Sequence, residues 1–307
     1  MLWSPDVTSA IVIGVLPMPR PSRITCAPDG RDTTCSEAGP VTGVDGSATL
    51  AAVEPNATVY LVAGLPYRSR VWAEQWPEVI RNALEACAMR GARLIFFDNV
   101  YMYGRTQGPM TEDTPVNPCS RKGEVRARIA RDVLEAAQAG RLRACIARSA
   151  DFYGPEAGEN SVPNLLIFAP LGAGKRPAWL GNPDLPHSFT YTPDCARALP
   201  LLAAADDAWG QVWHLPTASP ALAGRDFIAL AATQFGKPAK FTALGPWMVW
   251  MAGLFDRRTM EAVEMMYQST GPYLFDSTKF ERRFGFTPTS YAQGIVETSA
   301  AYRRATR

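Results

Sequence analysis

Residues 93–104 spell RLIFFDNVYMYG, an apolar run that passes into polar and aromatic residues before a glycine. A short continuous apolar run of this kind is typical of a strand buried on both faces of a sheet. Before it, residues 71–92 carry apolar side chains at helical spacing, and Gly91 is a typical helix stop. After it, residues 123–140 predict an amphipathic helix and 142–155 the next strand and loop. This alternation predicts a parallel sheet covered by helices.

Composition places the chain among ordinary globular proteins. It has 307 residues, and 31 basic against 29 acidic side chains leave a formal net charge of +2. This balance gives no electrostatic reason to expect nucleic acid or a membrane surface as a partner. The six cysteines form no CxxC pair and the two histidines are far apart, so we expect no metal site. No secretory signal is evident, which predicts a reducing, cytoplasmic location.

The most membrane-like segment is FTALGPWMVWMAGLF, residues 241–255. It is too short to span a bilayer and contains Pro246. We interpret it as a buried helix or the wall of a substrate pocket, and the alternative is an interfacial contact with a membrane. The preferred interpretation leaves the protein with no membrane partner.

Residues 15–48 interrupt the regular pattern. They contain few apolar residues and no periodicity, where a doubly wound fold needs its first crossover helix and second strand. The composition predicts loop or disorder. Our hypothesis is that residues 15–44 are eroded or translated in a shifted frame, and sequencing the coding DNA tests it.

Several short motifs occur in an order that is more specific than any one of them. Together they resemble the extended short-chain dehydrogenase/reductase family, also called the NAD-dependent epimerase/dehydratase family, over roughly residues 57–300. The motifs are VAG at 62–64, Asn82 on a helix, FDNVYMYG at 97–104, TEDTPVNPCSRKG at 111–123, RSADFYGP at 148–155, FTYTPD at 189–194 and FGFTPTSYAQGI at 284–295.

The resemblance implies an α/β fold: a Rossmann-like, doubly wound parallel sheet with a smaller C-terminal substrate lobe. It implies a Rossmann-like NAD(P)-binding domain at 1–165, with 15–44 atypical, and a mixed C-terminal lobe at 166–307. Residues 187–216 would return to the Rossmann sheet. The family also implies a possible homodimer, paired through helices at 71–89 and 124–139.

Members of this family use a Tyr-x-x-x-Lys pair for acid/base chemistry and for holding the nicotinamide ribose, with a Ser or Thr nearby. Matching Gly123 to the family glycine places Lys122 at the tyrosine, Arg126 at the lysine and Asn99 at the Ser/Thr. A register with Lys122 as the family lysine places Pro118 at the tyrosine. The phenolic acid/base is missing in both registers.

Substitutes for the missing phenol are available. Tyr101 and Tyr103 follow the same strand, and Lys122 could act as a base if burial and Arg126 lowered its pKa. The alternative is structural: Lys122 and Arg126 would form a solvated helix face that pairs with Glu124 or Asp132.

The cofactor positions are also altered. In the family, Gly-x-x-Gly-x-x-Gly follows the first strand and binds pyrophosphate. Here Gly14 is followed at that spacing by Pro17 and Arg20, so we expect NADP or NAD to bind weakly, or Gly14 merely to end a strand. The remaining expected cofactor-binding positions are Ala63, Gly64, Asn82 and Arg126.

Two residues of the resemblance point to the substrate. Asp151 falls where the family often has an Asn that faces the substrate, and His187 where sugar-nucleotide enzymes often have a phosphate-binding Arg. Neutral His is a poorer phosphate ligand than Arg, which argues against a nucleotide-sugar.

The sequence therefore predicts an NAD(P)-dependent oxidoreductase or epimerase/dehydratase-like protein that acts on a small, fairly apolar substrate. One alternative is a non-catalytic module of the same fold that binds a nucleotide or a partner protein. Another is a cofactor-free isomerase or hydratase that uses Lys122 or Asp151.

Overall fold

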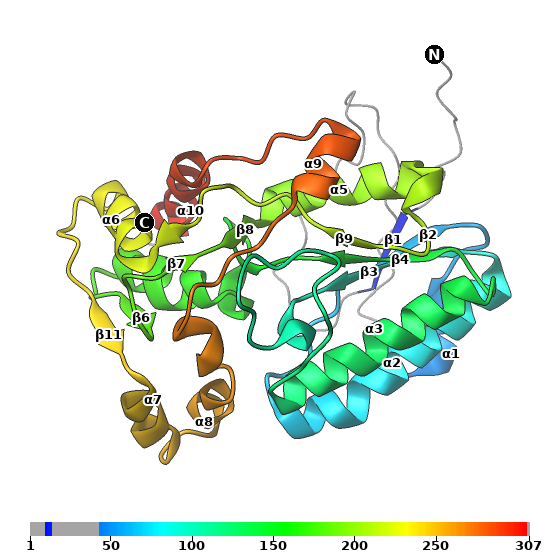
Figure 1. Ribbon diagram of the computed structural model, residues 1–307, viewed down its shortest axis with the longest axis horizontal. Coiled ribbons are helices and arrows are strands. Elements are labelled where there is room, and N and C mark those ends of the chain that lie inside the picture. Colours follow the sequence, from blue (N-terminus) through cyan, green and yellow to red (C-terminus); the bar gives the residue numbers. More distant parts are fainter. Residues whose placement is uncertain (1–9, 14–42, 306–307) are drawn as a thin grey trace. The chain divides into compact units, whose positions relative to one another are not determined.

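A computed structural model describes residues 10–13 and 43–305 (Figure 1). The chain divides into two compact units, each treated separately below. The sheet unit comprises residues 1–102, 121–148 and 196–213, and the C-terminal unit comprises 103–120, 149–195 and 214–307.

A five-stranded sheet in the order β1-β2-β3-β4-β9 is the framework of the sheet unit. The pairs β1–β2, β2–β3 and β3–β4 are all parallel, and every residue of β2 and β4 is buried. This confirms the predicted α/β fold with a parallel sheet. The strands are β1 (Ala10–Ile13), β2 (Thr58–Leu61), β3 (Arg93–Asp98), β4 (Ala144–Arg148) and β9 (Val212–His214).

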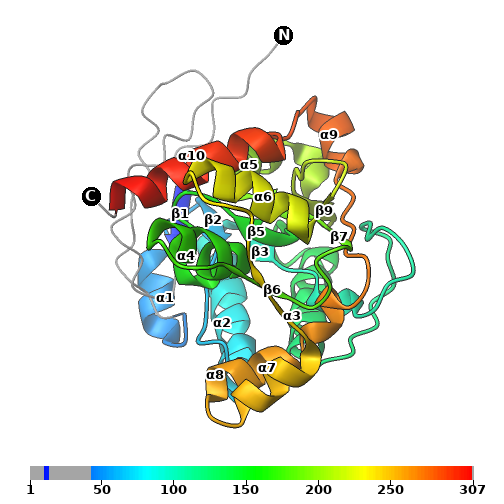
Figure 2. The ribbon, with the colours of Figure 1, turned by 90° about the vertical axis from the view of Figure 1, so that its left-hand side faces the viewer.

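Helices cover both faces of this sheet. In Figures 1 and 2, α2 and α3 lie side by side on one face and α5 lies on the other. Gly91, with φ of 62°, ends α2, and Gly140, with φ of 67°, follows α3, so both predicted glycine stops are confirmed. The helices are α1 (Gly46–Ala52), α2 (Ser69–Arg90), α3 (Arg121–Gln138) and α5 (Thr192–Ala204).

The irregular segment of the sequence is only partly described. Its end is not a loop, because α1 begins at Gly46 and Asp45 caps it by accepting hydrogen bonds from the Ser47 and Ala48 amides at 2.9 and 3.2 Å. Residues 14–42, including Gly14, lie outside the described residues. The roles of Gly14 and Arg20 and the shifted-frame hypothesis therefore stay predictions.

Short strands around an aromatic core form the C-terminal unit. Tyr153, Phe168 and Phe227 are fully buried there, and Tyr291 packs against them. Its strands are β5 (Asp151–Tyr153), β6 (Ala178–Leu180), β7 (Pro186–His187), β8 (Phe189–Tyr191), β10 (Leu222–Ala223) and β11 (Thr242–Leu244). Its helices are α4 (Ala169–Gly172), α6 (Gly224–Gln234), α7 (Pro246–Gly253), α8 (Arg257–Val263), α9 (Thr278–Phe284) and α10 (Tyr291–Ala305).

Of the residues expected to return to the large sheet, 212–214 do so as β9, whereas 189–191 pair with β5. The predicted domain boundary at residue 165 stays a prediction.

The apolar segment 241–255 is not a buried helix. Its side chains include Trp247, which is 70% exposed, and Phe255, which is 89% exposed. The prediction of burial is wrong. Hydropathy depends only on which residues a segment contains, whereas burial depends on whether other parts of the chain pack against it. Within the described ranges, no helix is long and apolar enough to cross a membrane.

Candidate functional site

Arg126 is buried between the two long helices of the sheet unit. Its guanidinium lies 4.7 Å from the ring centroid of Trp72 and 4.1 Å from that of Trp76, both on α2. Its Nη1 donates to Asp98 Oδ1 at 3.1 Å. Two aromatic faces and a carboxylate therefore surround this cation, and its side chain is only 7% exposed.

Asp98 ends β3 with its carboxylate completely buried between two arginines. Arg148, at the end of β4, donates from Nε to Asp98 Oδ2 at 3.4 Å, opposite the contact with Arg126. Burial raises the pKa of Asp98, while the charges of Arg126 and Arg148 act in the other direction. Burial also lowers the pKa of Arg126. The three side chains form a buried ion triad, which sequence reasoning did not identify.

Lys122 is buried at the start of the same helix. Its ammonium donates to Ser69 Oγ at 3.1 Å and lies 4.4 Å from the ring centroid of Tyr67. The side chains of Lys122 and Arg126 both contact residues of α2 or of the loop before it. The predicted solvated helix face is therefore wrong, because both side chains are more than nine-tenths buried.

The other expected positions of the sheet unit lie at strand ends and in α2. Ala63 and Gly64 directly follow β2, and Asn99 follows β3, where its Oδ1 accepts from the Tyr101 amide at 3.1 Å. Asn82 is buried, and its Nδ2 donates to the carbonyls of Gly43 and Val44 at 3.0 and 2.9 Å. Asn82 thus braces the backbone that leads into α1.

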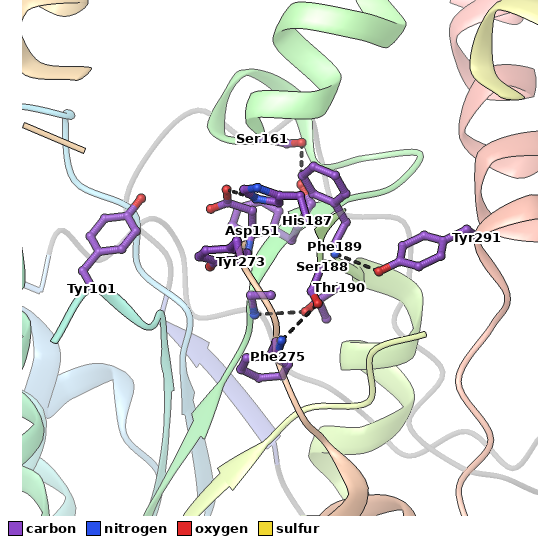
Figure 3. A network of polar contacts seen from close by, with 12 residues as sticks. Tyr101, Asp151, Ser161, His187, Ser188, Phe189, Thr190, Tyr273, Phe275 and Tyr291 are labelled. Atoms are coloured by element: carbon purple, nitrogen blue, oxygen red, sulfur yellow. Dashed lines mark hydrogen bonds and ion pairs between the residues drawn. The ribbon is translucent and has the colours of Figure 1, made fainter. Parts of the chain in front are cut away.

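In the C-terminal unit, Asp151 and His187 form a direct pair. His187 Nε2 lies 2.9 Å from Asp151 Oδ2, and Figure 3 shows the two side chains pointing toward one another. The Asp151 side chain is 20% exposed and that of His187 only 7%. A carboxylate paired with an imidazole can hold and transfer a proton. These two predicted substrate residues are therefore brought together.

Aromatic rings enclose this pair. The His187 ring stacks between Phe189 and Tyr273, with centroids 4.5 and 4.2 Å away, and Trp179 meets it edge-on at 5.9 Å. The Tyr273 hydroxyl also accepts from the Asp151 amide at 3.2 Å. The stacking fixes the plane of the imidazole and gives the pair largely apolar surroundings.

Tyr103 is buried and engaged elsewhere in this unit. Its hydroxyl lies 2.9 Å from His214 Nε2, and His214 Nδ1 lies 2.8 Å from the Asp276 carbonyl. Because a carbonyl only accepts, Nδ1 carries a proton, and in the neutral ring Nε2 accepts from Tyr103. With 1% of Tyr103 exposed, its phenol serves as a structural donor in this arrangement.

Sequence reasoning missed the partners of these residues. The sequence contained one indication for Asp98 and Arg148, because each is a charged residue at the end of an apolar strand. A charge that is buried there needs a partner. His214 was considered only as a possible metal ligand, and it is too far along the sequence from His187 to suggest a shared metal site. Tyr273 gave no signal, because it reaches His187 from a segment far along the chain.

The parallel sheet, its two helical layers and the polar residues at its strand ends define a Rossmann-like α/β protein. Residues 41–214 match the family described as NAD dependent epimerase/dehydratase, and the chain belongs to that family. No significant match is found among curated proteins.

Solved structures share the fold at low sequence identity. A dTDP-glucose 4,6-dehydratase from Streptomyces venezuelae with NAD bound is 19% identical, with 85% of this chain and 77% of that chain covered and a TM-score of 0.68. The UDP-glucuronic acid 4-epimerase of Bacillus cereus with NAD is 18% identical, with 86% of this chain and 78% of that chain covered and a TM-score of 0.66. RMD of Pseudomonas aeruginosa with NADPH is 13% identical, with 97% of this chain and 99% of that chain covered and a TM-score of 0.69.

In the register that matches Gly123 to the family glycine, the tyrosine and lysine positions hold two buried cations. Arg126 is stacked on tryptophans and paired with Asp98, and Lys122 is fully buried. The Nη1 of Arg126 is committed to Asp98, whereas its Nε is a buried donor with no hydrogen-bond partner among the described residues. The roles of Lys122 and Arg126 in catalysis and cofactor binding stay predictions, and no reaction step is assigned to them.

Proposed function

We propose that this chain is an NAD(P)-dependent oxidoreductase or epimerase/dehydratase-like protein that takes a small, fairly apolar substrate in its C-terminal unit. The observation that carries this proposal is the Asp151–His187 pair with its surrounding aromatic rings. Family membership supports the choice of NAD or NADP as the cofactor.

The environment of His187 favours an apolar substrate over a nucleotide-sugar. The Asp151 carboxylate 2.9 Å from the imidazole repels a phosphate at the place where the family often has an arginine. Aromatic faces from Phe189 and Tyr273 favour a ligand that can displace water from apolar surface. The substrate class of the sugar-nucleotide neighbours is therefore not carried over to this chain.

Asp151 and His187 would transfer the proton that the family's tyrosine normally handles. Asp151 is the more exposed of the two and orients the imidazole through its contact with Nε2. Proton transfer by a positioned imidazole is a common form of acid/base catalysis. In this assignment Lys122, Arg126 and Tyr103 have structural roles and are no longer proposed as acid/base groups.

A second candidate is a non-catalytic nucleotide- or partner-binding module of the same fold. The observation in its favour is that the family's acid/base positions are buried and paired at Lys122 and Arg126. Homodimerisation through α2 and α3 stays a proposal from the resemblance.

Saturation-transfer NMR tests the substrate class, with acetophenone and UDP-glucose as probes and NADP present. We expect transfer to the protons of acetophenone and none to UDP-glucose, because the site around His187 is aromatic and carries a carboxylate. Transfer to UDP-glucose alone would contradict the proposal. If acetophenone binds but a parallel assay with NADPH in place of NADP shows no consumption of NADPH, the non-catalytic candidate is favoured.

A further inference from the structure

A cavity of about 420 Å³ lies at the amino ends of two neighbouring strands of the sheet unit. Arg93 begins β3 and Ala144 begins β4, and both line the cavity together with residues from the ends of α2 and α3. Cofactors of open α/β sheets bind at the carboxyl ends of the strands, which is the opposite edge. The cavity is therefore separate from the expected cofactor site, and its volume lies in the range of small-molecule sites, roughly 300–1,000 Å³.

Three arginines and a tryptophan give this cavity a cationic wall. The guanidinium carbons of Arg93 and Arg143 lie 5.4 and 5.7 Å from the ring centroid of Trp209. Arg141 is exposed, and its side chain has no hydrogen-bond or ion-pair partner among the described residues. None of the described residues that line the cavity is acidic. Like charges concentrated in a cavity attract an anion.

Asp206 offsets only part of this charge. Its Oδ1 accepts from Arg143 Nη2 at 2.7 Å, and the side chains of Asp206 and Arg143 are 90 and 51% exposed. An ion pair as exposed as this one contributes little to stability. A guanidinium carries five N–H donors, so Arg143 can bind a ligand while it keeps its contact with Asp206.

Backbone amides at the cavity are already used within the protein. The amide of Arg141 donates to the Ala136 carbonyl at 3.1 Å, and that of Gly210 donates to the Ala144 carbonyl at 2.7 Å. The amide of Gly91 donates to a carbonyl in the last turn of α2. An anion in this cavity would therefore be held by side chains, and the guanidiniums are the charged donors among them.

We propose that this cavity binds a phosphorylated small molecule, with Arg141 and Arg143 holding the phosphate. Guanidiniums bind phosphate through paired hydrogen bonds, and a phosphate monoester offers three acceptor oxygens to neighbouring arginines where a carboxylate offers two. Stacking on Trp209 restricts the guanidinium of Arg143 before a ligand arrives, which lowers the entropic cost of binding. Cys87 and Leu142, which also line the cavity, give the organic part of the ligand an apolar surface.

Calorimetric titration of the full chain with phenyl phosphate tests the proposal, with phenol and inorganic phosphate as comparison ligands. We expect one saturable site for phenyl phosphate with a Kd below about 1 mM, weaker binding of inorganic phosphate and no binding of phenol. Arg141→Gln should weaken the binding of phenyl phosphate by about tenfold or more, because it removes charge-assisted hydrogen bonds. Arg131→Gln is the matched control: it removes the same charge from an arginine of α3 that is 66% exposed and outside the cavity, and should bind like the unchanged protein.

Three results would overturn the proposal. One is the absence of saturable binding of phenyl phosphate to the unchanged protein. Another is equal binding by Arg141→Gln and the unchanged protein, which would place the ligand elsewhere, such as at the carboxyl ends of the strands. The third is inorganic phosphate that binds as tightly as phenyl phosphate, which would assign the cavity to a free anion.

Discussion

Replacing Arg126 by alanine is expected to lower the free energy of unfolding by about 3–5 kcal/mol, the usual result of breaking a buried ion pair. The variant leaves the Asp98 carboxylate buried with one arginine in place of two, and it removes the stacking on Trp72 and Trp76. Urea unfolding followed by far-UV circular dichroism measures the change.

A matched control lies on the same helix. Arg131 pairs with Glu135 at 4.0 Å, and both side chains are about two-thirds exposed, at 66 and 65%. Arg131→Ala should therefore change the free energy of unfolding by less than about 0.5 kcal/mol. Adding Asp98→Asn to Arg126→Ala should not recover the loss, because it leaves the buried guanidinium of Arg148 without its carboxylate. An Arg126→Ala variant as stable as the control would contradict the structural role of Arg126.

The loss in Arg126→Ala should also depend on pH. Burial already raises the pKa of Asp98, and removing a neighbouring cation raises it further. A carboxyl whose pKa is higher in the folded state binds protons more readily there, so stability falls as pH rises from about 4, its ordinary unfolded value. The destabilisation should therefore be larger at neutral pH than at about pH 4.

Replacing Asp151 by asparagine is expected to lower the turnover of an apolar carbonyl probe, such as acetophenone with NADPH, by about 10²–10⁴-fold. The amide keeps the shape of the carboxylate but can neither accept a proton nor stabilise a protonated His187. His187→Gln should cause a similar loss. The double variant should lose little more, because the two residues act as one unit.

The assay follows NADPH absorbance, with thermal unfolding measured in parallel to show that each variant is folded. Glu156→Gln serves as the control, since Glu156 is an exposed acid five positions after Asp151 in the same unit. Full turnover by Asp151→Asn would remove the pair from the proposed chemistry. If Glu156→Gln lost as much activity as Asp151→Asn, the loss would come from removing a negative charge from this unit and not from the chemistry of Asp151.

The sheet and its helices could be predicted because their signals are local. Apolar runs identified β2, β3 and β4, and the glycines at 91 and 140 located the ends of two helices. The burial of Lys122 and Arg126 could not be predicted, because their partners come from α2 and β3. Basic residues in a first helical turn are ordinarily solvated, and only the packing of Trp72 and Trp76 shows otherwise.

The candidate site shows the same division between local and distant information. Asp151 and His187 were each predicted to face a substrate, but their contact depends on how the short strands of the C-terminal unit pair. Tyr273, which stacks on His187, comes from yet another segment. The exposure of α7 was likewise unpredictable, because hydropathy cannot distinguish a covered apolar helix from an uncovered one.

Calorimetric titration with NADPH and NADH tests most directly whether this chain binds a dinucleotide without a ribose contact from Arg126. The titration is made into the unchanged protein and into Arg126→Met, which removes the cation and leaves Asp98 paired with Arg148. We predict saturable binding of one cofactor below about 1 mM, the upper end of ordinary enzyme affinities, with little difference between the two proteins. Absence of binding to the unchanged protein, or loss of binding in a variant that stays folded, would contradict it.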